Sequence, residues 1–358
     1  MKLKKIWKVI ISMFLILIIL GIALILLYNY QMSAVDKNDN TDVVFVVKQG
    51  DSTKEIAKNL EDSKLIHNKV FFLMYLKLYN INNLQASTYK LNRTMEMDEI
   101  INIINKGKGY NPDEITLTFK EGKNIRSIAK VIENNTNNKY NDVIEKTNDM
   151  NYVNSLIKKY WFVENDIKKT GIFYKLEGYL FPNTYIFDNK DVTVEEIFNK
   201  MLNETDKVLS KYKEDIEKSD LSIQEIITLA SIVELEGTND KDRPNIASVF
   251  YNRLEKGISL GSDVTACYAQ KIDDTALCHR TANFNYKSDY NTRLLTNLGL
   301  PIGPICNPSE SSIKAVLNAP KTNYLYFVAD KNTNVYFFKS KSEFDAKINE
   351  LKKNGEWL

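Results

Sequence analysis

The key stretch is SIQEIITLASIVELE, at residues 222–236. Ser222 and Glu225 stand at the spacing of a capping box, in which each side chain binds the other residue's backbone N–H group, so the pattern predicts that a helix begins there. Glu236 points about 160° away from Glu234 on this helix. Glu234 instead shares a face with three apolar residues: Ile223, Ile227 and Ala230.

This placement of Glu234 has a chemical consequence. Apolar surroundings disfavour an ionised carboxylate, so they raise its pKa. A glutamate with a raised pKa keeps a proton near neutral pH and can donate it to a leaving oxygen. The alternative is that Glu234 lies at a helix edge and pairs with a lysine or arginine. The helical pattern leaves both alternatives open.

Composition limits the class of protein. The chain has 358 residues, with 48 Lys and Arg against 46 Asp and Glu, for a net charge of +2. Nucleic-acid binders carry a strong basic excess, which is absent here, so we expect no nucleic-acid partner. Hydrophobic residues make up 44% of the chain and aromatic residues 11%, which is enough to build a core. The length predicts two or three domains.

The sequence lacks the usual motifs of metal and cofactor sites. The two histidines, His67 and His279, are far apart, and the sequence contains neither a C-x-x-C pair nor H-E-x-x-H. It also lacks a G-x-S-x-G elbow and a phosphate-binding glycine loop. We therefore expect no metal site and no cofactor.

The N-terminus predicts a membrane anchor. The uncharged run VIISMFLILIILGIALILL occupies residues 9–27 and follows the lysine-rich segment 1–8. Nineteen helical residues nearly cross a hydrocarbon core of about 30 Å, and the lysines favour a cytoplasmic tail. A cleaved signal peptide is the alternative, but residues 28–31 (YNYQ) are not a small-residue cleavage site. We expect a cytoplasmic tail at 1–8, one helix at 9–28 that crosses the cell membrane, a linker at 29–42 and an extracellular remainder.

A repeated pattern follows the linker. A strand is predicted at residues 43–48, ahead of a helix that Ser52 and Glu55 cap. The same order returns 72 residues later, so that Gly50 corresponds to Gly122. We interpret residues 43–110 and 111–215 as two related α+β units. Small modules of this kind outside a membrane often bind glycan, as LysM modules do; the alternative is a scaffold that positions the next domain.

Loops rich in hydroxyl, amide and aromatic groups follow the key helix. Asp242-Arg243-Pro244 opens a second helix, because proline is tolerated in a first turn. We expect loops at 260–269 (LGSDVTACYA), 288–293 (SDYNTR) and 298–309 (LGLPIGPICNPS). Their side chains suit a saccharide, whose hydroxyls need hydrogen bonds and whose rings stack on aromatic faces. The alternative is that the glycines and prolines only make turns.

At this point the sequence resembles a known family, the YceG-like endolytic murein transglycosylases, which are membrane-anchored enzymes that cut nascent peptidoglycan strands. The resemblance implies an α+β fold with a single-pass N-terminal anchor, a LysM-like module and a YceG-like catalytic domain, whose core we place at 216–358. The matching segments are LEGYLFPNTY (176–185), LASIVELEG (229–237), IASVFYNRL (246–254), LGSDVTACY (260–268), YNTR (290–293), GLPIGPICNPS (299–309) and TNYLYFVAD (322–330).

The resemblance assigns the catalytic acid to Glu234, the glutamate of the A-S-I-V-E motif. The family's S-D-P-T motif occurs here with valine in third place, at residues 262–265. Glu177 is a second carboxylate of interest, which orients the site or pairs with an arginine such as Arg253. The candidates for binding sugar hydroxyls or stem-peptide amides are Glu177, Tyr185, Arg253, Ser262, Asp263, Thr265, Tyr290, Asn291 and Thr292.

The implied reaction needs one carboxylate instead of the usual glycosidase pair. The C6 hydroxyl of N-acetylmuramic acid attacks C1 and closes a 1,6-anhydro ring, so the enzyme is a lyase that cuts the β-1,4 bond to N-acetylglucosamine. Such cuts would end glycan elongation. We expect glycan strands as the substrate, and peptidoglycan synthases and the elongation or division machinery are candidate partners that the sequence does not distinguish.

Two rival functions remain open. One is a non-catalytic wall-binding scaffold. The other is a cysteine transpeptidase of the sortase kind, because Cys278, His279 and Arg280 are adjacent, although neighbours in sequence rarely meet as nucleophile and base. The cysteines also allow two readings. Cys267 and Cys278 form a disulfide and leave Cys306 free, or all three are buried small hydrophobic residues.

Overall fold

The computed structural model describes residues 2–107 and 109–357 of a mixed α+β protein. Met1, Lys108 and Leu358 lie outside the described residues; they belong to the expected tail, the expected 43–110 module and the expected 216–358 core. The chain forms two compact units, Met1–Pro112 and Asp113–Leu358.

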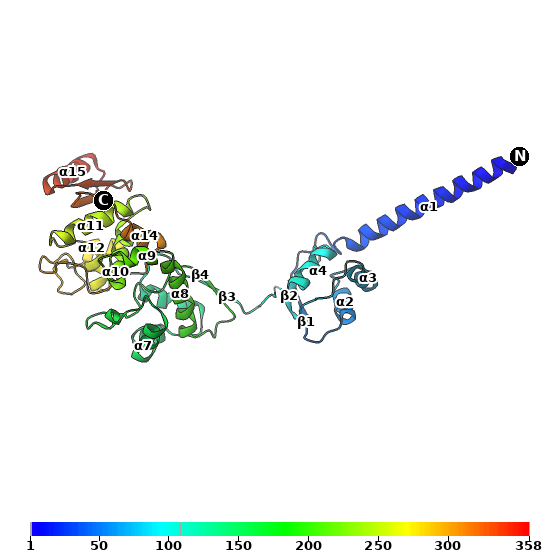
Figure 1. The fold of residues 1–358 in the computed structure, drawn as a ribbon, viewed down its shortest axis with the longest axis horizontal. Coiled ribbons are helices and arrows are strands. Elements are labelled where there is room, and N and C mark those ends of the chain that lie inside the picture. Colours follow the sequence, from blue (N-terminus) through cyan, green and yellow to red (C-terminus); the bar gives the residue numbers. More distant parts are fainter. Residues whose placement is uncertain (1, 108, 358) are drawn as a thin grey trace. The chain divides into compact units, whose positions relative to one another are not determined.

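The first unit begins with one long helix, α1 (Lys2–Met32). Its segment Ile10–Met32 is long and apolar enough to cross a membrane. The helix continues four residues beyond the end that we expected at residue 28 (Figure 1). The extension has a physical reason, because the ring of Tyr28 lies against Phe71 and the ring of Tyr30 stacks on His67.

The rest of the first unit is a small module around a two-stranded antiparallel sheet. In the sheet Phe45 is paired with Tyr89, and both side chains are buried with Leu60, Phe72 and Ile100. The capping box of Ser52 and Glu55 starts the first helix of the module as predicted. The elements are β1 (Val43–Val47), α2 (Thr53–Asp62), α3 (Lys69–Leu78), β2 (Ser87–Leu91) and α4 (Met97–Lys106).

The second unit opens with the same order of strand and helix. Leu117 is paired with Tyr185 in its antiparallel sheet, at the positions that correspond to Phe45 and Tyr89 in the first sheet. The elements are β3 (Ile115–Thr118), α5 (Ile125–Asn135), α6 (Tyr140–Asn148), α7 (Met150–Lys159), the 3₁₀ helix η1 (Asn165–Lys168), β4 (Thr184–Phe187) and α8 (Val194–Ser210).

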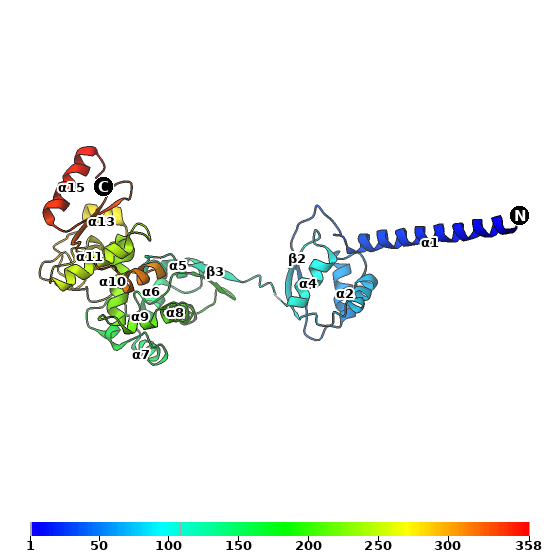
Figure 2. The same cartoon turned by 45° about the horizontal axis from the view of Figure 1, so that its top comes forward.

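The centre of the second unit is the predicted helix, α10 (Ile223–Glu236), which begins at the Ser222 cap. Three later helices, α11 (Arg243–Glu255), α12 (Asp263–Ala269) and α14 (Glu310–Leu317), pack against it (Figure 1), and Figure 2 shows α11 beside α10 from a second side. One hydrophobic core extends from Leu117 to Val316, so the expected segments 111–215 and 216–358 share it. The remaining elements are α9 (Lys213–Glu217), α11 (Arg243–Glu255), α12 (Asp263–Ala269), α13 (Thr275–Thr281), α14 (Glu310–Leu317), β5 (Tyr326–Ala329), β6 (Val335–Phe338) and α15 (Lys341–Asn354).

One expected loop is wrong: residues 263–269 form the short helix α12. Thr265, Ala266 and Tyr268 are buried there, and the helix packs against α10. The expectation came from composition, and packing against a neighbouring helix overrides such local preferences. The predicted start of α11 with an early proline is confirmed, and the helix is followed by Gly257, which has φ +60°.

The turn before β4 packs closely onto α10, and this generates a stability prediction. Gly178 has φ +86°, and a Cβ atom there would lie 2.6 Å from Pro304 and 2.7 Å from Ile227. Gly178→Ala should lower the free energy of unfolding by about 2–4 kcal/mol, because overpacking adds to left-handed strain. Gly257→Ala is the matched control: it has open space around it and should cost about 1 kcal/mol. Equal losses in urea unfolding would contradict the packing argument.

Candidate active site

Glu234 lies in the last turn of α10 and is 9% exposed. Its Oε1 atom accepts a hydrogen bond from Nη2 of Arg243 at 2.9 Å. Its Oε2 atom accepts bonds from the backbone N–H of Ser309 at 2.9 Å, the hydroxyl of Ser309 at 2.5 Å and the hydroxyl of Ser312 at 2.7 Å. Both oxygens are therefore fixed by donors from α11 and from the start of α14.

The apolar setting that we expected for the carboxyl group of Glu234 is wrong. The backbone of α10 is surrounded by apolar residues, but the carboxyl group lies at the N-terminus of α14, which favours negative charge. Arg243 adds an ion pair in which both side chains are almost fully buried. The alternative from the sequence, an arginine partner, therefore describes this side chain.

Glu177 occupies a fully buried position, where it contacts the start of α5, α12 and the loop before α14. Its carboxyl group accepts hydrogen bonds from the backbone N–H of Ile125, the hydroxyl of Tyr268 at 2.8 Å and the amide of Asn307 at 3.3 Å. Burial raises the pKa of Glu177 from 4.5 to about 8. The side chain is 1% exposed, so it holds three segments together rather than facing solvent.

Asn307 links Glu177 to the surroundings of Glu234. Its backbone N–H and side-chain amide both donate to the carbonyl of Lys123, and its own carbonyl accepts the N–H of Gly122. A Cβ atom on Gly122 would lie 3.6 Å from Cγ of Glu234, so the backbone of this loop covers the glutamate. The chain then continues from Asn307 to Ser309, which binds Glu234.

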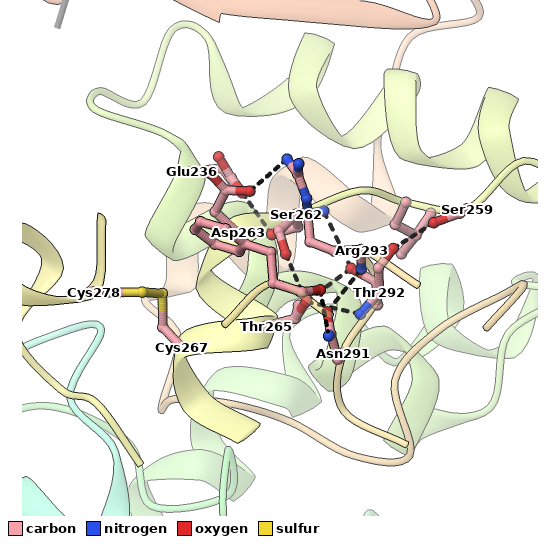
Figure 3. A network of polar contacts seen from close by, with 12 residues as sticks. Glu236, Ser259, Ser262, Asp263, Thr265, Cys267, Cys278, Asn291, Thr292 and Arg293 are labelled. Carbon is pink, nitrogen blue, oxygen red and sulfur yellow. Dashed lines mark hydrogen bonds and ion pairs between the residues drawn. A yellow bond between two sulfur atoms is a disulfide. The ribbon is translucent and has the colours of Figure 1, made fainter. Parts of the chain in front are cut away.

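The motif at residues 262–265 forms a network of hydroxyl groups with Thr292 (Figure 3). The Ser262 hydroxyl donates to Oε1 of Glu236 at 2.6 Å, and the Ser262 N–H donates to the Thr292 hydroxyl. The hydroxyls of Thr265 and Thr292 are 2.8 Å apart. Burial raises the pKa of Glu236 to about 6. Asp263, which is half-buried, forms an ion pair with Arg293.

The other predicted binding residues have intramolecular partners. The Tyr290 hydroxyl accepts the N–H of Phe173, and the amide of Asn291 donates to two backbone carbonyls. Arg253 donates from Nε and Nη1 to the carbonyls of residues 325, 259 and 260. Tyr185 lies in the core at β4, where its hydroxyl donates to the Phe181 carbonyl, and it is not brought to the 262–265 network.

Two adjoining cavities border the end of α10. The smaller has a volume of about 90 Å³ and includes Gly122, which covers Glu234; the larger, of about 420 Å³, includes Glu236 and Arg293. Four residues line both cavities: Leu235, Asp263, Val264 and His279. These shared walls make one cleft that runs along α10 and α12.

The structure pairs Cys267 with Cys278 in a disulfide and leaves Cys306 buried and free. The disulfide joins α12 to α13 at the wall of the smaller cavity. The cysteine transpeptidase alternative is therefore wrong for Cys278, because a disulfide sulfur is not a thiolate nucleophile. In the part of the chain that the structure describes, no group of three His, Cys, Asp or Glu side chains is arranged to hold a metal ion.

Sequence reasoning missed Ser309, Ser312 and Asn307 as neighbours of the glutamates. One local signal was available, because Ser309 caps α14 through the N–H of Ser312. That signal predicts the start of a helix but not its meeting with Glu234, which lies 75 residues earlier.

The raised pKa of Glu177 predicts a pH-dependent stability. The unfolded chain releases this proton near pH 4.5, but the folded chain keeps it until about pH 8, so the free energy of unfolding falls between these values. Glu177→Gln removes this titration. Relative to the variant, the native chain should lose stability on the order of 3 kcal/mol between pH 4.5 and pH 7, with a plateau above pH 8. Thermal unfolding of both chains across this range measures it, and parallel curves would contradict it.

Comparisons with known proteins agree with this architecture. The model of the YceG-like family matches residues 45–350. A Bacillus subtilis (strain 168) protein named endolytic murein transglycosylase is 36% identical over 313 residues, covering 87% of this chain and 85% of that protein. A protein of the same name from Streptococcus pneumoniae serotype 2 (strain D39 / NCTC 7466) is 32% identical over 343 residues, covering 90% of this chain and 61% of that protein.

A solved structure is similar as well. The crystal structure of a YceG-like protein from Listeria monocytogenes matches with a TM-score of 0.61 and 36% sequence identity. The match covers 86% of this chain and 99% of that one. On the family match and the identity to these relatives, the chain belongs to the YceG-like family.

Proposed function

We propose that this chain is a membrane-anchored endolytic transglycosylase of peptidoglycan. The observation that carries the proposal is the family match over residues 45–350, with relatives named endolytic murein transglycosylase, together with a fixed glutamate at a cleft. The substrate is the glycan strand, and the bond is the β-1,4 link from N-acetylmuramic acid to N-acetylglucosamine. The product carries a 1,6-anhydro ring, and each cut terminates elongation of a strand.

Glu234 is the catalytic residue in this proposal. Its protonated carboxyl group donates to the glycosidic oxygen while the bond from C1 to that oxygen breaks. The C6 hydroxyl of the muramic residue then attacks C1, and its proton passes to the carboxylate, which restores the starting state. No water is consumed, so the enzyme is a lyase.

The partners of Glu234 fit the charge that this cycle creates. The carboxylate that remains after proton donation lies beside Arg243 and accepts three hydrogen bonds from Ser309 and Ser312. Donors that are already in place stabilise developing charge without the cost of reorganising solvent. The same donors fix the orientation of the carboxyl group, so proton donation requires that one oxygen turns toward the cleft.

The cleft along α10 and α12 is the proposed glycan path. Asp263 and Val264 lie at its shared wall and Ser262 lines the larger cavity, and these residues are the proposed contacts for sugar hydroxyls. Thr265, Tyr290, Asn291 and Thr292 are buried and act by shaping that wall. Arg253 and Glu177 support the loops behind it, and Tyr185 stays a candidate without a contact in the cleft.

We further propose the placement of the whole chain. Helix α1 crosses the cell membrane with the lysine-rich segment 1–8 inside, and residues 43–358 work outside. A disulfide supports an oxidising, extracellular compartment. Residues 43–110 are proposed as a LysM-like module, 111–215 as a joining unit and 216–358 as the catalytic core. Peptidoglycan synthases and the elongation or division machinery are the proposed partners.

A non-catalytic scaffold is the second candidate, and the product of the reaction distinguishes the two. A scaffold binds glycan strands and leaves them uncut. The fixed carboxyl group of Glu234, covered by the Gly122 loop that lines the cleft, favours the enzyme.

Glu234→Gln should abolish release of anhydromuropeptides, with a loss of at least about 10²–10⁴-fold in rate, because an amide cannot donate and accept the proton. Full-length protein is incubated with uncrosslinked glycan strands, and mass spectrometry weighs the products. The matched control is Glu225→Gln on the same helix, because glutamine keeps the capping box and this residue is remote from the cleft.

Two outcomes would overturn this assignment. One is a Glu234→Gln variant that cuts as fast as the native chain while both share one melting temperature. The other is a product heavier by one water than the anhydro form, which would show that water rather than the C6 hydroxyl attacks C1.

A further inference from the structure

Helix α3 (Lys69–Leu78) is apolar on two opposite sides. Phe72 and Leu76 are buried in the module core. The opposite side presents Val70, Met74 and Leu78, which are 57%, 61% and 75% exposed. These three residues stand at i, i+4 and i+8 and form one stripe, which we call the outer face of α3. A helix that is apolar all round is stable when both sides are covered, in a protein core or by lipid.

The outer face lies beside the end of the membrane helix. The ring of Tyr28 is 5.8 Å from that of Phe71, which stands next to Val70 on α3. Tyr30 stacks at 4.4 Å on His67, just before α3 begins. Helix α1 and α3 therefore meet within one turn of Tyr28, inside the same compact unit (Figure 1).

The depth of Tyr28 in a bilayer follows from the sequence. The apolar run of residues 9–27 spans about 28 Å, close to the thickness of a hydrocarbon core. Trp7 and Tyr28 flank this run, and aromatic residues of this kind lie at the two interfaces of a membrane. Tyr28 then lies at the outer boundary of the hydrocarbon, and α3 lies at the level of the lipid headgroups.

We propose that the outer face of α3 is embedded in the interface of the membrane that α1 crosses. The proposal rests on α1 as a membrane anchor and is independent of the catalytic activity. The occupant is lipid, because the first turn of α3 contacts the outer end of α1 through Phe71 and Tyr28, and α1 carries exposed apolar side chains along its length. Lys77 is exposed at the edge of the stripe, where a long basic side chain reaches headgroup phosphates. The first module is thus held against the membrane surface.

The test measures which reagent reaches the outer face. Full-length Val70→Cys carries a nitroxide label in phosphatidylcholine and phosphatidylglycerol vesicles, with fewer than one chain per vesicle. Collisions with oxygen, which enters lipid, are compared with collisions with a water-soluble nickel complex. The matched control is Val46→Cys, an exposed valine on β1 of the same module. Labelling of the native chain measures the background from its own cysteines.

The label at position 70 should collide more often with oxygen than with the nickel complex, and the label at position 46 should show the reverse. Adding Met74→Glu and Leu78→Glu should lower the ratio of oxygen to nickel collisions at position 70 to that of the control, because charged side chains move from the interface into water. Both native side chains are exposed, so the variant should keep the fold and its circular dichroism spectrum. A Val70 label with the ratio of Val46 would overturn the proposal. The proposal would also fail if the label at position 70 were shielded from both reagents, or if it were shielded from the nickel complex only with several chains in each vesicle. Either result would show that protein rather than lipid covers the outer face of α3.

Discussion

The hydrogen bonds from Ser309 and Ser312 to Glu234 join two helices that the chain places far apart. They bring the N-terminus of α14 to the last turn of α10, and the two helices pack against each other in the core of the second unit. A carboxylate that leaves water needs donors to replace those it has lost, and an isolated one would be costly. The fold meets this need with the start of one helix and the guanidinium of Arg243 from another. The position of the glutamate therefore depends on three helices at once.

A second buried carboxyl group supports the loops that complete this arrangement. Glu177 accepts the N–H that begins α5 and the amide of Asn307, and Asn307 is paired in turn with Lys123 and Gly122. Gly122 covers Glu234, and Asn307 leads into Ser309. Two backbone segments that contact Glu234 are thus tied to one buried carboxyl group. A small shift at Glu177 would reach Glu234 through two short backbone segments, because packed interiors transmit strain.

Local sequence patterns predicted where helices begin and end, whereas contacts with distant segments determine the surroundings of each candidate site residue. The caps at Ser52 and Ser222 and the stop at Gly257 depend on residues within one turn, so the sequence displays them directly. The serine donors of Glu234 lie at the start of a helix that begins 76 residues later, and a helical wheel holds no information on which segment will cover a face. The same limit explains α12: its hydroxyl-rich sequence favours a loop, but packing against α10 stabilises a helix there. The pattern at 262–265 predicted groups that bind sugar, whereas the hydroxyls of Ser262 and Thr265 are buried and hydrogen-bond within the protein.

Three glutamates near the end of α10 differ only in their surroundings, and the surroundings separate their roles. Glu177 is fully buried among neutral donors, so burial dominates and the carboxyl group holds a proton above neutral pH. Glu236 is half-buried and accepts a single serine hydroxyl in the larger cavity. Glu234 has an arginine and a helix N-terminus, which are the partners that a carboxylate needs at the moment it has given its proton away. Only the third arrangement combines fixed geometry with charge compensation, and for this reason the proposed proton transfer is assigned to Glu234 rather than to Glu177 or Glu236.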